Sequence, residues 1–120
     1  MEKIVSFGKG KNIGLKATAR TPRLYRFLIG RDMIVDMNQL KKNFDKASKK
    51  GEDAQLSIAD LTIFENAAYI MAKQYDDSLP NSADEWLDSM DEVFTIYELL
   101  PHIFELWNLN QATTAIPKKK

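Results

Sequence analysis

The chain has 120 residues, of which 44% are hydrophobic and 28% charged, so it can form one compact domain with one core. It contains no cysteine, which excludes disulfides and thiolate metal sites, and no apolar run approaches the ~20 residues needed to span a bilayer. We expect no membrane association and, because no secretory signal is visible, a location in the cytoplasm.

The 17 basic and 17 acidic residues balance, but they are unevenly distributed. Residues 1–50 hold 13 basic and 4 acidic side chains, a net charge of +9. Residues 51–117 hold 1 basic and 13 acidic side chains, a net charge of −12, and the last three lysines add +3. Such asymmetry can indicate a nucleic-acid-binding arm or an acidic tail. It is also expected where two halves pack together and complement each other, which the strong apolar periodicity in both halves favours.

A β-hairpin is predicted at the start of the chain. Residues 3–7 and 12–18 are short alternating runs of apolar and polar residues with a glycine-rich turn between them. An isolated two-stranded hairpin is marginal in water, so it must pack on helices. Its free edges could accept another strand.

Two helices are predicted next. Thr21 and Pro22 are typical of an N-cap and a first helical residue, and Gly30 of a helix end. A second helix begins near Asp32. The apolar face predicted for the first helix consists of Leu24, Phe27 and Leu28, and that of the second of Met33, Met37, Leu40, Phe44 and Ala47.

Three further helices follow a loop. Ser57 with Asp60, and Ser82 with Glu85, are capping-box patterns that open the third and fourth helices. The stripe of the third helix is Ile58, Leu61, Phe64, Ala68, Met71 and Tyr75, widened by Ile63, Ala67 and Ile70, which predicts a central position. A last helix covers about 93–109, with Pro101 kinking it or beginning a new turn.

The fold class expected is therefore mainly α (α+β), a compact domain of about five helices with a small N-terminal β-hairpin. Residues 1–110 form this single domain, and residues 111–120, which show no periodicity, form a flexible C-terminal tail.

No catalytic, cofactor or metal site is predicted. His102 is the one histidine, so the chain alone supplies no His–His metal pair and no Ser–His–carboxylate set. The acidic pairs between residues 76 and 92 lack the spacing of an EF-hand loop. The glycines and lysines of residues 8–14 lead into a strand and not into a helix, which argues against a phosphate-binding loop.

The stretch "KATARTPRLYRFLIGRD" interleaves arginines with aromatic residues, a pattern that nucleic-acid surfaces share. Arg20, Arg23 and Arg26 recur every three residues, as on any solvated helix face. The phosphates of a nucleic-acid duplex would also be repelled by residues 51–117, whose net charge is −12. We therefore expect no nucleic-acid binding.

Three segments together carry a family resemblance: "KATARTPRLYRFLIGRDMIVDMNQLKK", "LTIFENAAYIMAKQYDDSLPNSADEWLDSM" and "TIYELLPHIFELWNLN". In order and spacing they resemble the tail assembly chaperones of long-tailed bacteriophages and prophages of Gram-positive bacteria. The resemblance covers most of residues 12–110. It rests on the combination, because no single motif is chemically specific.

The resemblance implies a non-enzymatic protein without cofactors that binds and solubilises the tape measure protein and helps to recruit the tail tube protein. It implies the host bacterial cytoplasm and absence from the mature virion. A frameshift-extended form of the chain is a further partner in many such phages, and the three terminal lysines are compatible with A-rich slippery codons or with an ordinary solvated tail. The alternatives are a small non-enzymatic phage regulatory or adaptor protein and, third, a nucleic-acid-binding protein.

The last helix supplies the candidate partner-binding residues. It carries more apolar residues than one stripe can hold, so a partner or self-association face is expected there. The candidates are Leu99, Leu106, Trp107 and Leu109. Trp107 is the preferred contact, because aromatic anchors dominate many interfaces. The alternative is that Trp107 closes the core.

Overall fold

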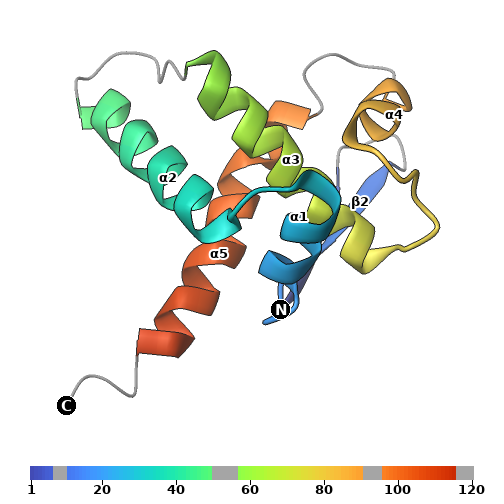
Figure 1. Ribbon diagram of the computed structural model, residues 1–120, viewed down its shortest axis with the longest axis horizontal. Helices are drawn as coiled ribbons and strands as arrows, with labels where there is room; N and C mark the ends of the chain where they lie inside the picture. Colours follow the sequence, from blue (N-terminus) through green and yellow to red (C-terminus); the bar gives the residue numbers. More distant parts are fainter. Residues whose placement is uncertain (7–10, 50–56, 91–95, 116–120) are drawn as a thin grey trace.

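The computed structural model describes residues 1–6, 11–49, 57–90 and 96–115, with side chains described as far as residues 46 and 107 in the second and fourth ranges. It confirms a mainly α-helical fold with an N-terminal antiparallel hairpin (Figure 1). The elements are β1 (Glu2–Ser6), β2 (Asn12–Lys16), α1 (Thr21–Ile29), α2 (Met33–Lys49), α3 (Ile58–Tyr75), α4 (Ala83–Asp88), a 3-10 helix η1 (Ile96–Leu99) and α5 (Leu100–Ala115). None of these helices is long and apolar enough to cross a membrane.

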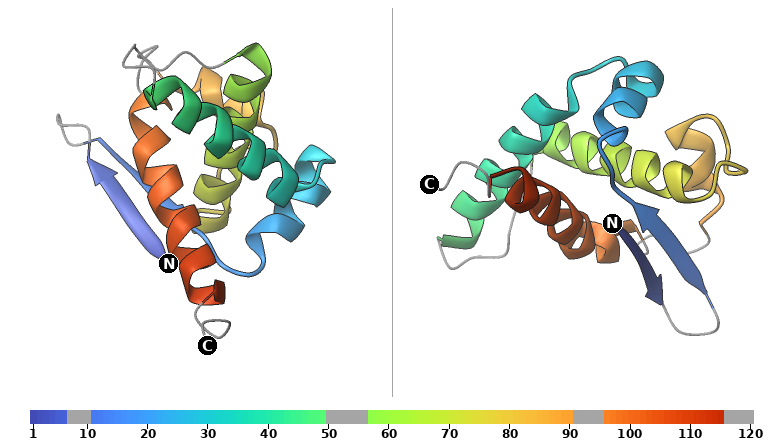
Figure 2. Two further views of the ribbon diagram at one scale, coloured as in Figure 1. Left: turned by 90° about the vertical axis from the view of Figure 1, so that its left-hand side faces the viewer. Right: turned by 90° about the horizontal axis from the view of Figure 1, so that it is seen from below.

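The helix α3 lies at the centre and contacts α1, α2, α4, α5 and β2 (Figures 1 and 2). Ser57 begins it with the predicted capping box, since its hydroxyl accepts from the Asp60 N–H and the Asp60 carboxylate accepts from the Ser57 N–H. The central position predicted for this helix is confirmed by the burial of Ile63, Ala67 and Ile70. Ile58 and Tyr75 were predicted in its buried stripe but are exposed, because they lie in the terminal turns.

The hairpin packs one face on the helices. Val5 and Leu15 are buried in the core, and Val5 lies between the exposed Ile4 and Ser6. From the same face Lys3 reaches α5, where its Nζ lies 2.7 Å from an oxygen of Glu105. This contact joins the first and the last element of the chain.

The start of α1 differs from the prediction. Thr21 is its first helical residue and not the N-cap, a place that Arg20 takes without a side-chain bond. The Thr21 hydroxyl instead accepts from the Thr18 N–H at 2.8 Å and donates to Gln74 Oε1 at 2.6 Å, so it ties α1 to α3. Phe27, predicted in the buried face, is 82% exposed, because the face that α1 buries is centred on Tyr25, two residues away.

A buried carboxylate fixes the corner between α1 and α2. Asp36 accepts from Tyr25 Oη at 2.8 Å and from two guanidinium nitrogens of Arg31 at 2.7 Å. Gly30 ends α1 with a φ of 84°, which confirms the predicted stop, since a left-handed residue there is best supplied by glycine. The helical stripe did not predict Asp36 as a core residue, although it is 1% exposed.

The last helical region begins in two steps. The 3-10 helix η1 is followed by α5, with Pro101 in the first turn of α5, which confirms the option that proline begins a new turn. The helix then continues to Ala115, beyond the predicted domain end at residue 110. Residues 93–95 of the predicted helix and 116–120 of the predicted tail lie outside the described residues.

Candidate binding groove

The predicted partner-binding residues lie mainly in the core. Leu99, Leu106 and Trp107 are all buried, and Trp107 is 7% exposed. Their placement agrees with the core alternative, and none of the three offers an open surface for a partner in this conformation. The Leu109 side chain lies outside the described residues. The indole N–H of Trp107 is buried and has no hydrogen-bond partner among the described residues.

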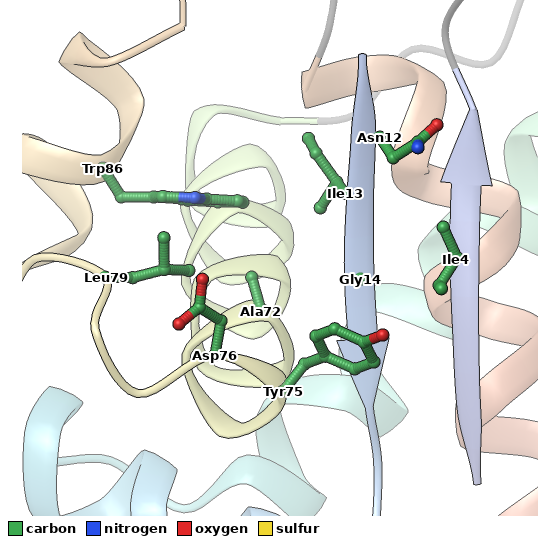
Figure 3. A pocket seen from close by; sticks show the side chains of 9 residues that line it. All are labelled: Ile4, Asn12, Ile13, Gly14, Ala72, Tyr75, Asp76, Leu79 and Trp86. Carbon is green, nitrogen blue, oxygen red and sulfur yellow. The ribbon is translucent and has the colours of Figure 1, made fainter. Parts of the chain in front are cut away.

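An open groove instead lies beside the hairpin, between β2 and the α3–α4 region (Figure 3). It has a volume of about 260 Å³. It is lined by side chains and backbone from both strands, from the end of α3, from the connection to α4 and from α4 itself: Ile4, Asn12, Ile13, Gly14, Ala72, Tyr75, Asp76, Leu79 and Trp86. The chain segments that form it are far apart in the sequence, so it exists only in the folded protein.

The wall formed by β2 is apolar. Ile13 points from β2 toward Trp86 and Leu79, and the Tyr75 ring lies across Gly14 (Figure 3). A Cβ atom at residue 14 would collide with that ring, so glycine is required for this close approach. Tyr75 is 38% exposed and marks the entrance of the groove.

The opposite wall is held in place by several contacts. Trp86 packs against Tyr69 with ring centroids 5.9 Å apart, and the Tyr69 hydroxyl donates to the Pro80 carbonyl at 2.5 Å. Lys73 Nζ donates to the carbonyls of Asp77 and Leu79 at 2.7 and 2.6 Å. These bonds anchor the α3–α4 connection, so the groove is largely formed before any ligand binds.

The α3–α4 side of the groove is acidic. Residues 73–90 contain one lysine and five carboxylates, a net charge of −4, and Asp76 lines the groove itself. Hydrogen bonds from the Ser78 side chain and backbone hold the Asp76 pKa below its usual value, so this carboxylate is ionised at neutral pH.

Further carboxylates along this region repel one another. Burial raises the pKa of Glu65, and the nearby charge of Asp84 raises it further. Burial also raises the pKa of Tyr69, and Glu85 adds to the shift. Of the carboxylates named here, Asp76 lines the groove, and beside Ile13, Leu79 and Trp86 it favours ligands that combine apolar and positively charged groups.

A second hollow of about 340 Å³ shares Tyr75 and Asp76 with the groove. It lies between α1 and the end of α3, and its remaining lining includes Arg20, Lys73 and Asp77. Positive and negative side chains are mixed there, so it has no clear charge preference.

In the described ranges, no group of three or more His, Asp or Glu side chains is placed to hold a metal ion.

The sequence analysis did not predict this groove as a site. Its one signal in the sequence was Gly14 between Ile13 and Leu15 in a predicted strand, a position that often marks the close approach of another group. Searches against protein-family models, curated proteins and solved structures find no match to the chain.

Proposed function

We propose that this protein is a tail assembly chaperone of a long-tailed bacteriophage or prophage, which binds a tape measure protein, keeps it soluble and helps to recruit tail tube subunits. The role requires binding only, without catalysis or a cofactor, and it is carried out in the host cytoplasm before the virion matures. The support from the sequence is the ordered set of segments that resemble this family.

The structural observation that supports the proposal is the partly apolar groove beside β2 (Figure 3). A chaperone must cover apolar side chains of its client, and a groove lined by Ile13, Leu79 and Trp86 offers a matching surface. Ile4 and Tyr75, which also line the groove, are exposed and so accessible to a client.

Co-expression tests the proposal. The tape measure protein encoded near this chain is produced with and without it, and its soluble fraction is measured. We expect the native chain to raise that fraction, the groove variant Leu79→Ser to raise it less, and the control Phe27→Ser, an exposed position outside the groove, to match the native chain. A client that is equally insoluble with and without the chain would refute the chaperone role.

A further inference from the structure

The hydrogen-bond pattern of the hairpin shows which backbone groups remain free. Met1 and Ala17 exchange both bonds, with Ala17 N donating to Met1 O at 2.8 Å and the Met1 amine donating to Ala17 O at 2.9 Å. In an antiparallel pair such exchanging pairs alternate with pairs whose N–H and C=O groups point outward. With Ile4 opposite Gly14, the outward-pointing residues of β2 are Asn12, Gly14 and Lys16.

The outward edge of β2 is the edge that borders the groove. Asn12 and Gly14 both line it, together with Ala72, Leu79 and Trp86 from the helical side. Within the described part of the chain, no backbone hydrogen bond from outside the hairpin reaches residues 12, 14 or 16. The groove therefore combines unpaired backbone donors and acceptors with apolar side chains, as strand-accepting sites do.

The charge of the opposite side indicates what kind of segment fits. Asp76 lies at the groove, and Asp77, Asp84 and Glu85 follow it in the sequence of the α3–α4 segment. Lys73, the one basic residue of the region, is bonded to two backbone carbonyls. Lys73 lowers the Asp76 pKa through its charge, and Arg20 lines the neighbouring hollow. Neither forms an ion pair with Asp76 within the described residues, so this carboxylate can still pair with a cation on a bound segment.

We propose that the groove beside β2 is a strand-docking site for an extended segment of a partner protein, in which lysine or arginine alternates with branched apolar residues. The segment adds as a third strand to the edge of β2, with backbone bonds to Asn12 and, once the partly exposed Tyr75 ring has rotated away from it, to Gly14. Alternate side chains enter the groove toward Leu79 and Trp86. The inference goes beyond the proposed function, because it assigns a site and a bound conformation and would hold for a partner other than a tape measure protein.

The probe for the test is a short synthetic peptide that alternates lysine and valine, added to the isotope-labelled full chain and followed by NMR. We expect amide shifts centred on Asn12, Gly14 and Lys16, with slower hydrogen exchange at these amides. A peptide N-methylated at every second residue keeps its side chains but loses backbone donors, so it should fail to bind. Equal binding of both peptides, or shifts centred on another surface, would overturn strand docking.

Charge recognition is tested with matched variants. Asp76→Asn keeps an acceptor for Ser78 but removes the charge, so peptide affinity should fall by roughly two- to fivefold. Glu98→Gln removes the same charge from η1, outside the groove, and should leave the affinity unchanged. Melting temperatures confirm that both variants fold. If Asp76→Asn binds the peptide as tightly as the native chain, the proposal that the partner segment is basic is refuted. If analytical ultracentrifugation shows that the chain dimerises through β2 without peptide, the occupant of the groove is a second copy of the chain and not a different protein.

Discussion

Asp36 connects three parts of the chain through its two carboxylate oxygens. Tyr25 donates from α1, Arg31 donates twice from the turn, and Asp36 itself belongs to the first turn of α2. Hydrogen bonds to an ionised, buried acceptor are stronger than bonds between neutral groups. This cluster therefore holds α1 at a fixed angle to α2, which a turn of three residues alone would not do.

Arg31→Ala should destabilise the fold more than Tyr25→Phe. The first change removes two charge-assisted bonds and leaves the buried Asp36 carboxylate without a cationic partner, so we expect it to cause the larger loss in the free energy of unfolding. The second removes one bond and should cost about 1–2 kcal/mol. Urea denaturation measures both losses. As a control, Arg23→Ala changes an exposed residue, and its free energy of unfolding should stay within about 0.5 kcal/mol of that of the native chain. The reverse order would mean that Arg31 is not the main partner of Asp36.

Stability should also depend on pH through Asp36. The Arg31 hydrogen bond lowers the Asp36 pKa, burial works in the opposite direction, and the Tyr25 hydrogen bond lowers it further. The Asp36 pKa in the folded protein lies below its value of about 3.9 in the unfolded chain. The stabilisation of the fold by ionised Asp36 is therefore complete at pH values above the unfolded pKa, and it is lost as the pH falls through the folded pKa. Urea midpoints from neutral pH downward should fall less steeply in Arg31→Ala than in the native chain. Parallel curves would contradict this.

Trp107→Ala separates the two roles considered for that residue. With the indole buried against the core, truncation should cost about 3–5 kcal/mol of stability. Thermal denaturation checks the change, and co-expression with the tape measure protein checks the partner role. An unchanged melting temperature together with weaker client solubilisation would instead identify Trp107 as a contact.

At the scale of the helices, the caps are the features most open to test. The Ser57 hydroxyl accepts the Asp60 N–H at 3.1 Å, and Asn43 on α2 donates to both oxygens of the same Asp60 carboxylate. Ser57→Ala should therefore cost about 1 kcal/mol, within the usual range of about 0.5–2 kcal/mol for an N-cap. Chemical denaturation gives the value, and the exposed Ser6→Ala serves as a control. A loss no greater than that of Ser6→Ala would show that the cap contributes nothing.

Local chemistry made several element boundaries predictable from the sequence. The capping box of Ser57, the left-handed Gly30 and the new turn at Pro101 each depend on residues within one turn of the helix end. Thr21 shows the limit of such patterns. Its hydroxyl bonds across to Gln74 on α3, so a partner 53 residues away decided its role.

Burial and the groove could not be predicted in the same way. Phe27 and Ile58 fit an apolar stripe, but whether a stripe is covered depends on where the other helices lie. Asp36 is polar and buried because two donors from other turns reach it. The groove needs β2, α3 and α4 together, and no periodicity in one element describes it.

Across the whole molecule, the two signs of charge remain on different elements. Lys3–Glu105 is the ion pair that joins the basic half to the acidic half among the described residues. Arg20, Arg23 and Arg26 are exposed and form no ion pair within the described ranges, while residues 73–90 carry the net charge of −4. The Lys3–Glu105 contact therefore supports the idea that the halves neutralise each other, whereas these three arginines of the basic half take no part in such pairing within the described ranges.

A DNA duplex should nevertheless not bind appreciably. The total charge is zero, and the acidic α3–α4 surface repels phosphates that approach the arginines of α1. Fluorescence anisotropy with a labelled duplex at about 0.15 M salt should show no saturable signal. Tight binding that weakens steeply with added salt would overturn this expectation and favour a nucleic-acid role.

The contact between β1 and α5 has a consequence for synthesis of the chain on the ribosome. β1, β2 and α1 to α3 can assemble as they emerge, but the side of α3 that packs on η1 and α5 stays uncovered until the last helix has been translated. At elongation rates of about 5–20 residues per second, the interval between the start of α3 and the end of α5 lasts on the order of 3–12 s. During that time Phe64 and its neighbours are available to cellular folding factors, and the Lys3–Glu105 bond can form only after Glu105 in α5 has been translated.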